Sequence, residues 1–594
     1  MLTSQLFQGD AVLQAIADDN DRMSRRRHGR GEAARKIQTA LLTWNPGVLP
    51  RFGADGKYGD ETAAAVRRFK IEELGVAPAD VIDDVGPRTV NRLDEIQAAA
   101  EAPTPPPPPP PPPAPTTFIR RDVWTLQSAA PWDPITEAYA RAVRTMQARP
   151  ASDPTSWEFQ AAMHATFTTP ANPLWNGCQH ASWFFLPWHR MYLFFFEKIV
   201  RAAVIANGGP ADFALPYWNY DQPNPRNTLP QPFREATLPD GTPNPLLQAA
   251  PLRDPGIATG AELPSVRTSS TRAMNSTVFT APAGPTFGGP ASAPSNLDGG
   301  FGLLESQPHN IVHVLVGGRR PDSATDCSLA RMTEPRCAAL DPIFWLHHAN
   351  IDRLWNRWLD LGGGRANPTD AAWLNQRFSF ADENGATVQL SASDVLDTVA
   401  QLQYEYDDRP AVTPAPPIVV PVAPRAELIG ATEDAVAVAE RVTVPLLIPE
   451  SNRSRFMDLA RDVSGAFLSI ENIEATHNPG VVFDVLLNQP DADADPRRFL
   501  VGTFTLFGVE LMNNPDFVHE GAPGMNHQFD IADVISGLLA MDLWNPDTIT
   551  VTIEPVPPPA PPGERQQTVE ELGIEPIHVG RIALFAMERD DLVS

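Results

Sequence analysis

The sequence predicts a multidomain protein: a mainly α-helical central part, a small three-helix N-terminal domain and a C-terminal antiparallel β-sandwich. Two proline-rich segments divide the 594-residue chain, because runs of proline form neither helices nor sheet ladders. Apolar residues follow a helical period before the second segment and a period of about two after it. We expect domains at residues 1–102, 118–410 and 426–594, joined by linkers at 103–117 and 411–425.

The N-terminal domain is expected from three helical stretches with turn signals, namely ARKIQTALL, DGKYGDETAAAVRRFK and VIDDVGPRTVNRLDEI. Their pattern resembles the peptidoglycan-binding-like domain, although Lys70 stands where that family usually has glutamine. The resemblance implies binding of a cell-wall glycan, and a helical module for docking or assembly is the alternative. It is carried by Gln38, Asp55, Gly56, Gly59, Thr62, Gly86 and Thr89.

The C-terminal part is expected to be a β-sandwich because its apolar residues come in strand-length pieces. These pieces alternate with polar residues or run apolar throughout. They are AVAVAERVTVPLLI, GVVFDVLLN, FLVGTFTLFGV, TITVTIEPV and HVGRIALFAM.

Charge and cysteine content bear on partners and location. The formal charge of −26 argues against a nucleic-acid partner, which requires a basic surface. No run approaches the roughly 18 apolar residues of a membrane span, and no leader is recognised, so a cytoplasmic location is expected by default. The three cysteines fit a reducing compartment, although Cys327 and Cys337 could pair with each other.

Seven of the twelve histidines lie between His164 and His348, within strongly apolar segments. One of these segments, FLPWHRMYLFFFEKIV, predicts an internal helix that begins near Pro187 and carries His189 at its head. A buried polar group without a partner costs about 2–7 kcal/mol. Any single histidine is more simply a core residue bonded to a carbonyl, but the clustering indicates a metal site.

Helix signals place the remaining histidines on facing elements. His309 and His313 are four residues apart, so on a helix they share one face. Asp341 and Pro342 supply an N-cap and a first helical residue, which puts the adjacent pair His347–His348 about two turns into a buried helix. A four-helix bundle with inward ligands can hold two metals. An all-imidazole set suits copper, and ligand type leaves zinc open.

The histidine spacing in H…CQH…WHR, PHNIVH and DPIFWLHHANIDRLW resembles the type 3 copper proteins of the tyrosinase and polyphenol oxidase family. The resemblance covers about residues 118–409. It implies two copper ions, dioxygen as co-substrate and the oxidation of monophenols and o-diphenols to o-quinones. It also implies that His347 points away from the metals. The implied ligands are His164, His180 and His189 for the first copper, and His309, His313 and His348 for the second.

The similarity extends to residues around the ligands. Cys178 lies two residues before His180, and some family members link this sulfur to the ring as a thioether; a free buried thiol is the alternative. Tyr404 and Tyr406 resemble the Tyr-x-Tyr motif that ends the catalytic domain in the family.

Further roles are implied by position. Glu305 and Asn310 match the family's water-holding pair, which implies help in removing the phenol proton; for Glu305 the alternative is a carboxylate that stabilises a helix start. The family's gate residue falls near Glu334–Arg336. In latent members the C-terminal domain inserts a side chain over the coppers, and the loop 513–528, through Phe517, is the expected plug.

Three alternatives stay open: a haemocyanin-like oxygen carrier, a catechol or o-aminophenol oxidase without monophenolase activity, and an envelope-anchored binding protein with a vestigial oxidase. The expected partner is a phenolic small molecule, with no nucleic acid and no membrane. The sequence leaves open the natural phenol and whether the chain forms a homo-oligomer.

Overall fold

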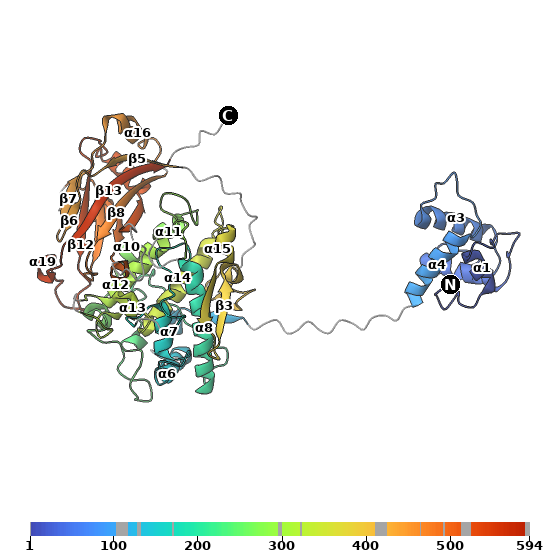
Figure 1. Ribbon diagram of the computed structural model, residues 1–594, viewed down its shortest axis with the longest axis horizontal. Helices are drawn as coiled ribbons and strands as arrows, with labels where there is room; N and C mark the ends of the chain where they lie inside the picture. The colour runs from blue at the N-terminus through green and yellow to red at the C-terminus, as the bar shows by residue number, and fades with distance from the viewer. Residues whose placement is uncertain are drawn as a thin grey trace. The chain divides into compact units, whose positions relative to one another are not determined.

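The computed structural model (Figure 1) describes residues 2–101, 117–127, 132–168, 172–294, 300–320, 324–409, 425–463, 465–490, 494–512 and 524–587. The chain forms two compact units, Met1–Ala114 and Pro115–Ser594. The second unit contains the central helical part and the β-rich C-terminal part, and each has an apolar core. Apart from residues 117 and 425, the two predicted linkers lie outside the described residues.

The N-terminal unit has four helices around one apolar core, so the three-helix prediction was incomplete. The additional helix has only seven residues, and a helix this short is marginal by itself. Asp10 caps it, while Leu13 and Ile16 are buried in the shared core. The helices are α1 (Ala11–Ala17), α2 (Glu32–Trp44), α3 (Asp60–Leu74) and α4 (Pro87–Glu101).

The residues that carry the glycan-domain resemblance hold the turn between α2 and α3. The Gln38 amide nitrogen donates to Asp55 Oδ1 at 3.0 Å and to Thr62 Oγ1 at 2.9 Å. Its carbonyl oxygen accepts from the backbone N–H of Gly56, a residue with a φ of 74°. These contacts give the motif a structural role, and glycan binding stays a prediction.

The central part is mainly helical, and α7, α8, α12 and α14 contribute to one core. Helix α14 begins as predicted, with Pro342 first and Asp341 as N-cap, accepting from the Ile343 N–H at 3.1 Å. Helix α8 begins two residues before the predicted Pro187. The helices are α5 (Val123–Leu126), α6 (Pro134–Gln147), α7 (Trp157–His164), α8 (Phe185–Ala206), α9 (Pro255–Thr259), α10 (Ser265–Thr268), α11 (Thr271–Asn275), α12 (Ile311–Gly317), α13 (Pro335–Ala338), α14 (Pro342–Asp360) and α15 (Ala371–Asn375).

Short turns and small sheets complete the central part. The turn η2 is irregular, because Gln307 inside it has an extended backbone with φ −145°. The turns are η1 (Gln231–Phe233), η2 (Glu305–Asn310), η3 (Arg331–Thr333) and η4 (Ala392–Val395). Strand β1 (Phe118–Arg120) pairs in parallel with β4 (Tyr404–Tyr406), and β2 (Arg377–Ala381) pairs antiparallel with β3 (Thr387–Ser391).

A buried ionic network ties α8 to α14. Asp352 on α14 accepts from Arg190 of α8 at 2.5 Å and from Arg120 at 3.2 Å. The hydroxyls of Tyr404 and Tyr406 both donate to Asp352 Oδ2 at 2.6 Å. Buried charges of this kind need full pairing. The network therefore fixes two histidine-bearing helices against each other through the Tyr-x-Tyr motif.

The C-terminal part contains two antiparallel sheets that share one core, as expected for the predicted sandwich. The sheet orders are β10-β9-β12-β7 and β11-β8-β13-β5, with β6 pairing with β13. The strands are β5 (Ala426–Ala431), β6 (Val436–Val438), β7 (Val442–Pro445), β8 (Ala466–Glu474), β9 (Val482–Leu487), β10 (Leu500–Phe504), β11 (Met525–Asp530), β12 (Thr550–Val556) and β13 (Ile577–Met587). The helices and turns are η5 (Glu450–Asn452), α16 (Arg453–Asp458), η6 (Pro496–Arg498), α17 (Val509–Met512), α18 (Ala532–Ala540) and α19 (Val569–Leu572).

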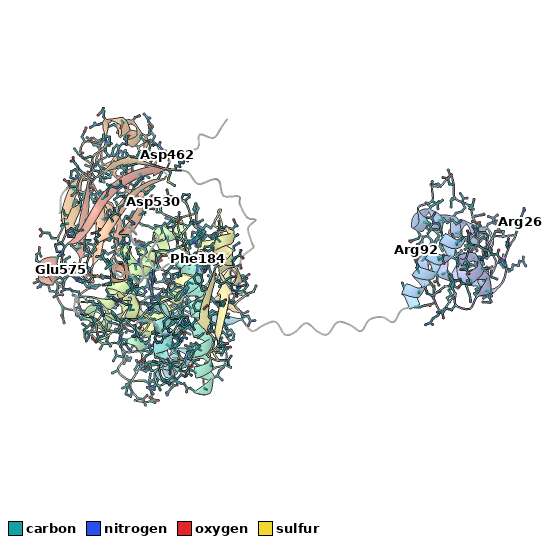
Figure 2. The ribbon with its side chains drawn as sticks, viewed as in Figure 1. Arg26, Arg92, Phe184, Asp462, Asp530 and Glu575 are labelled. Atoms are coloured by element: carbon teal, nitrogen blue, oxygen red, sulfur yellow. A yellow bond between two sulfur atoms is a disulfide. The ribbon has the colours of Figure 1, made fainter. Side chains whose placement is uncertain are left out.

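The two parts of the second unit are in direct contact. Arg267 of α10 forms an ion pair with Asp484 of β9 at 2.6 Å, and Ser306 of η2 contacts His527 of β11 at 3.1 Å. Figure 2 shows the side chains, with Phe184 in the central part and Asp530 in the β-rich part. Among the described residues, no helix has the length and apolarity needed to cross a membrane.

Cys327 and Cys337 form a disulfide, the pairing that the sequence left open. Disulfides are rare in reducing compartments. The location of the protein stays a prediction.

Candidate metal centre

The seven histidines predicted from the apolar segments are all buried in the central core, with relative exposures of 0–3%. Six different segments position them, and each segment is apolar because it packs inside that core. His164 ends α7, His180 lies in the loop before α8, His189 is on α8, His309 is in η2, His313 is on α12, and His347 and His348 are on α14.

The second predicted cluster is tightest around His348. Its Nε2 lies 3.3 Å from Nε2 of His309 and 3.2 Å from Nε2 of His313. Metal–imidazole bonds are about 2.0–2.1 Å long. The ligand atoms of the whole cluster lie within 4.8 Å of one another, so these three nitrogens could hold one ion between them.

The first predicted cluster joins His164, His180 and His189 to Cys178, and the ligand atoms of all four lie within 4.8 Å of one another. The Cys178 sulfur is 3.4 Å from Nδ1 of His180 and 3.4 Å from Nε2 of His189. The cysteine is a buried free thiol in the structure. Its sulfur contacts the ring to which the resemblance implies a thioether.

The two clusters are neighbours. The rings of His189 and His348 stack at 4.5 Å between centroids with planes 12° apart. Phe185 packs on both clusters, 4.5 Å from the His189 ring and 4.7 Å from the His309 ring. The six predicted ligands thus form one continuous group with an aromatic wall.

Backbone and amide oxygens orient four of the six rings through Nδ1. Because a carbonyl oxygen only accepts, each of these rings carries its proton on Nδ1 and leaves Nε2 for a metal. Each Nδ1 donates at 2.8 Å: His164 to Pro335 O, His189 to Phe185 O, His309 to Asn310 Oδ1 and His313 to Met332 O.

Burial keeps the histidines neutral. It lowers the pKa of His164 to about 4 and holds the pKa values of His189, His309, His313 and His348 well below the ordinary 6.5. A metal ligand must be deprotonated at the binding nitrogen. The rings are therefore ready to bind a cation at neutral pH.

His347 lies beside the second cluster, whereas the resemblance implied that it points away. Its ring stacks on His309 at 5.2 Å with planes 21° apart, and its ligand atom is grouped with those of His309, His313 and His348. Neither ring nitrogen has a hydrogen-bond partner among the described residues. Adjacent residues on a helix point in different directions. His347 nevertheless lies beside the second cluster, because η2 and α12 place the rings of His309 and His313 on the side that His347 faces.

The predicted water-holding pair is buried in the core with unused polar atoms. Glu305 Oε1 accepts from the Ala181 N–H at 2.8 Å, and Asn310 Oδ1 accepts from His309. Within the described residues, Glu305 Oε2 and Asn310 Nδ2 have no partner. Burial raises the pKa of Glu305 well above its usual range. Both free groups are suited to a small polar guest.

Phe507, from the C-terminal part, covers the second cluster and was missed by the sequence interpretation. Its ring stacks on His313 at 4.3 Å and lies 5.6 Å from His180 and 5.8 Å from His309. The predicted plug residue, Phe517, lies outside the described residues. Because Phe507 falls within a strand-like apolar run, its sequence context gave no sign of this position.

The region in which the resemblance placed a gate residue, Glu334–Arg336, contacts the first histidine cluster. Glu334 pairs with Arg336 at 2.7 Å, and Arg320 is 3.8 Å from the same carboxylate. The backbone carbonyl of Pro335 is the one that holds His164. A gating role for this region stays a prediction.

Comparisons with known proteins identify the family. The common central domain of tyrosinase matches residues 154–361, the polyphenol oxidase middle domain matches residues 367–413, and a domain of unknown function matches residues 425–587. A tyrosinase from Hahella sp. (strain CCB-MM4) is 34% identical over 491 residues, which cover 75% of this chain and 96% of that relative. The chain belongs to the tyrosinase and polyphenol oxidase family.

Plant members of the tyrosinase and polyphenol oxidase family are also similar. A chloroplastic polyphenol oxidase from Malus domestica is 29% identical over 464 residues, covering 70% of this chain and 72% of that relative. The solved structure of latent apple tyrosinase has 25% identity and a TM-score of 0.52, with 79% of this chain and 97% of that chain covered. The protein is therefore an enzyme of a copper oxidoreductase family.

The donor set fits the metal of this family. Six buried imidazoles suit copper, and Nε2 of His164 has no partner among the described residues. Both clusters offer the nitrogen ligands that a type 3 copper pair requires. The N-terminal unit lies outside all three family matches.

Proposed function

We propose that this protein is a latent dicopper oxidase that hydroxylates monophenols and oxidises o-diphenols to o-quinones with dioxygen. The carrying observation is the pair of adjacent, buried, neutral histidine clusters beneath an aromatic ring of the C-terminal part. His164, His180 and His189 would hold one copper, and His309, His313 and His348 the other. When bound, such a pair supplies the activation of dioxygen and accepts electrons from the phenol.

The position of Phe507 supports an aromatic substrate. Its ring stacks at 4.3 Å on His313, a geometry that a phenol ring can adopt in the same place. Phe185 packs against the rings of His189 and His309 at 4.5 and 4.7 Å and adds a second aromatic ring to the lining of the clusters. A substrate ring therefore requires Phe507 to withdraw.

The free atoms of Glu305 and Asn310 support monophenol hydroxylation. We assign to them a water that accepts the phenol O–H proton as the substrate approaches the metals. The Ala181 N–H fixes the Glu305 carboxyl, and the His309 ring fixes the Asn310 side chain. This assignment favours a tyrosinase over a catechol oxidase without hydroxylase activity.

Latency is supported by the burial of Phe507 in the central core rather than in the β-rich core. Latent apple tyrosinase resembles this chain over a length that includes the C-terminal part. We propose that the C-terminal part blocks the metal centre until it is displaced or removed.

Oxygen consumption by copper-loaded protein tests the proposal. We expect sustained uptake with p-cresol after a lag, and with 4-methylcatechol without one. Cleavage between residues 410 and 424 is expected to raise both rates. Oxygen binding without turnover would indicate a carrier, and turnover of the catechol alone would indicate a catechol oxidase. Equal rates before and after cleavage would exclude latency.

A further inference from the structure

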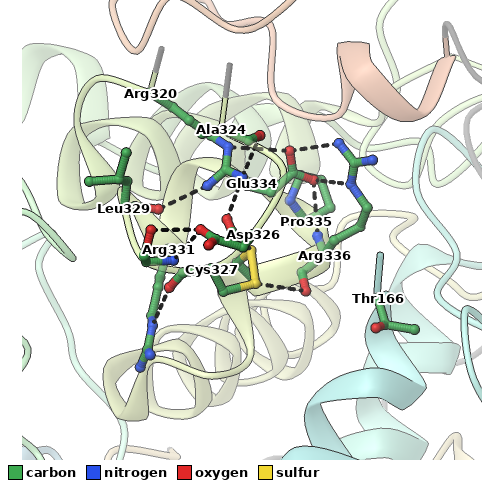
Figure 3. The surroundings of a disulfide bond; sticks show 12 residues. Thr166, Arg320, Ala324, Asp326, Cys327, Leu329, Arg331, Glu334, Pro335 and Arg336 are labelled. Carbon is green, nitrogen blue, oxygen red and sulfur yellow. Dashed lines mark hydrogen bonds and ion pairs between the residues drawn. A yellow bond between two sulfur atoms is a disulfide. The ribbon is translucent and has the colours of Figure 1, made fainter. Parts of the chain in front are cut away.

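The Cys327–Cys337 disulfide closes a short segment of the central part that contains η3 and α13 (Figure 3). Cys337 is fully buried on α13, with 1% relative exposure, whereas Cys327 is half-buried. Neither cysteine belongs to a histidine cluster. The disulfide therefore has a role other than direct metal ligation.

The closed segment supplies one oxygen to each histidine cluster. Met332 O accepts from Nδ1 of His313 at 2.8 Å, and Pro335 O accepts from Nδ1 of His164 at 2.8 Å. The other two Nδ1 bonds are local, since His189 donates one turn back along α8 and His309 donates to the next residue. The segment is thus the shared support of both clusters.

Several hydrogen bonds besides the disulfide fasten the first half of the segment: the Ala330 N–H donates to Pro251 O at 2.8 Å, the Arg331 N–H donates to Leu252 O at 2.9 Å, and Arg331 Nη1 donates to Gln248 Oε1 at 2.7 Å. Within the segment, Leu329 O accepts from Arg320 at 2.9 Å and Cys327 O accepts from Arg331 Nε at 3.1 Å (Figure 3). The bonds to Leu329 O and Cys327 O end on backbone carbonyls of the loop itself, so these two bonds depend on the loop keeping its shape. The disulfide is a covalent cross-link between the start of this half and α13.

The second half is packed against a histidine helix. The Thr333 hydroxyl donates to Gly318 O at 2.7 Å, directly after α12. A Cβ on Gly317 would lie 2.2 Å from the Thr333 nitrogen, so the backbones are in close contact. A shift of the segment would therefore move the Met332 carbonyl relative to His313.

We propose that the Cys327–Cys337 disulfide is a positioning element of the metal centre, holding the Met332 and Pro335 carbonyls that orient His313 and His164. This inference rests on the proposed function only in that the clusters bind metal. Groups that orient a metal-bound histidine typically change affinity by about 10- to 100-fold when they are removed. One bridge thereby controls metal retention at both clusters.

The bridge also makes metal retention dependent on redox state. Reduction by TCEP breaks the S–S bond and leaves two thiols, while the phosphine becomes its oxide. One water molecule supplies the oxygen of the oxide and the two thiol hydrogens. A thioether at Cys178 would not be reduced, so the treatment acts on this disulfide alone.

The test uses full-length apoprotein titrated with zinc, which has no redox chemistry and accepts imidazole ligands. The variant is Cys327→Ser/Cys337→Ser, which removes both the bridge and the thiols. The matched control is Ser328→Ala, because this change removes a hydroxyl of the same segment, which donates to Asp326 just outside it, and leaves the bridge intact. We expect the zinc Kd to rise about 10- to 100-fold in the double variant and to stay unchanged in the control.

A bridge that only stabilises the fold would lower the unfolding midpoint of the apoprotein and leave zinc affinity, measured well below that midpoint, unchanged. That outcome overturns the inference. Wild-type apoprotein, reduced with TCEP and desalted without oxygen, gives a second measurement if the double variant does not fold. Weaker zinc binding that recovers on reoxidation supports the proposal, and equal binding contradicts it. Oxidised wild type that binds neither zinc nor copper would instead refute the proposed function.

Discussion

The second cluster takes all its histidines from the stretch between His309 and His348, whereas the first takes its ligands from α7, a loop and α8. In the second cluster, Nε2 of His313 and Nε2 of His309 lie 3.2 and 3.3 Å from Nε2 of His348. In the first cluster a cysteine sulfur lies among the nitrogens.

The two clusters also differ in their contact with the Phe507 ring. Phe507 stacks on His313 in the second cluster, while its contact with the first is the 5.6 Å edge approach to His180. The comparison indicates that the second cluster is where access is controlled. In the first cluster, the loop before α8 and Cys178 determine how the ligands are arranged.

Removing the central ring of the second cluster should have the largest effect. In His348→Ala we expect at most one copper per chain and a loss of phenol oxidation of about 10³-fold or more, since essential groups acting as a unit fail together. The neighbouring His347→Ala is the matched control and should retain two coppers. Elemental analysis checks both. Equal copper loss in the two variants would mean that His347 is a ligand.

Removing the covering ring should activate the enzyme. Deleting a buried phenylalanine side chain costs about 3–5 kcal/mol, so Phe507→Ala should weaken docking over the second cluster. We expect the uncleaved protein to oxidise 4-methylcatechol at least about tenfold faster. Phe456→Ala is the control, because Phe456 stacks on Trp544 at 4.2 Å in the β-rich core. Equal activation by both variants would assign the effect to general destabilisation.

Acid should release the C-terminal part from the second cluster at a defined pH. Two groups near the contact between the central and C-terminal parts, His527 and Glu510, have opposite effects on docking when they titrate. Burial between Phe301 and Phe504 lowers the pKa of His527 from 6.5 to about 3, against the opposing effect of its hydrogen bond to Thr505 O. When the C-terminal part is released, the His527 ring would bind its proton more readily than it does in the docked state. Docking therefore weakens as the pH falls from 6.5 toward 3, by up to about tenfold per unit.

Glu510 on α17 opposes this trend. Burial, together with the neighbouring Glu334 carboxylate, raises the pKa of Glu510 from 4.5 to about 7 against the weaker opposing effect of Arg336. The docked state then binds the extra proton, so docking strengthens as the pH falls from 7 to 4.5. The two effects offset each other between 6.5 and 4.5, and activation is expected only below about pH 4.5.

Variants at these two positions sharpen the pH prediction. Glu510→Gln should shift the onset of acid activation up to about pH 6.5, and His527→Gln should abolish it. Reversible activation profiles of uncleaved protein measure both. An unshifted onset in Glu510→Gln would show that this carboxyl does not sense docking.

The smallest effect is expected in the first cluster. Cys178→Ser should retain two coppers and change the rate of phenol oxidation by only a few fold, because the sulfur positions His180 without being required as a ligand. Mass spectrometry of the peptide that contains Cys178 and His180 provides the second measurement. A thioether lowers its mass by two hydrogens, and an alkylatable thiol would contradict the link.

Local sequence patterns alone predicted the elements that carry the site. The N-cap and proline at the start of α14, the apolar run of α8 and the histidine spacing are local features, and the structure contains these helices with their histidines buried. The seven-residue α1 was missed because its stability comes from packing rather than from its own residues.

The sequence by itself therefore determined the histidine-bearing helices α8 and α14 and the change to β structure, because helix caps and apolar periods are encoded within a few residues. Only the tertiary structure decided that Phe507 enters the central core and that Met332 and Pro335 orient two distant histidines. An apolar side chain in a strand-like run fits any core equally well, and a backbone carbonyl has no sequence signature. Which surface each one meets depends on contacts between separate segments of the chain: Pro335 lies 171 positions from His164, and Met332 lies 19 positions from His313.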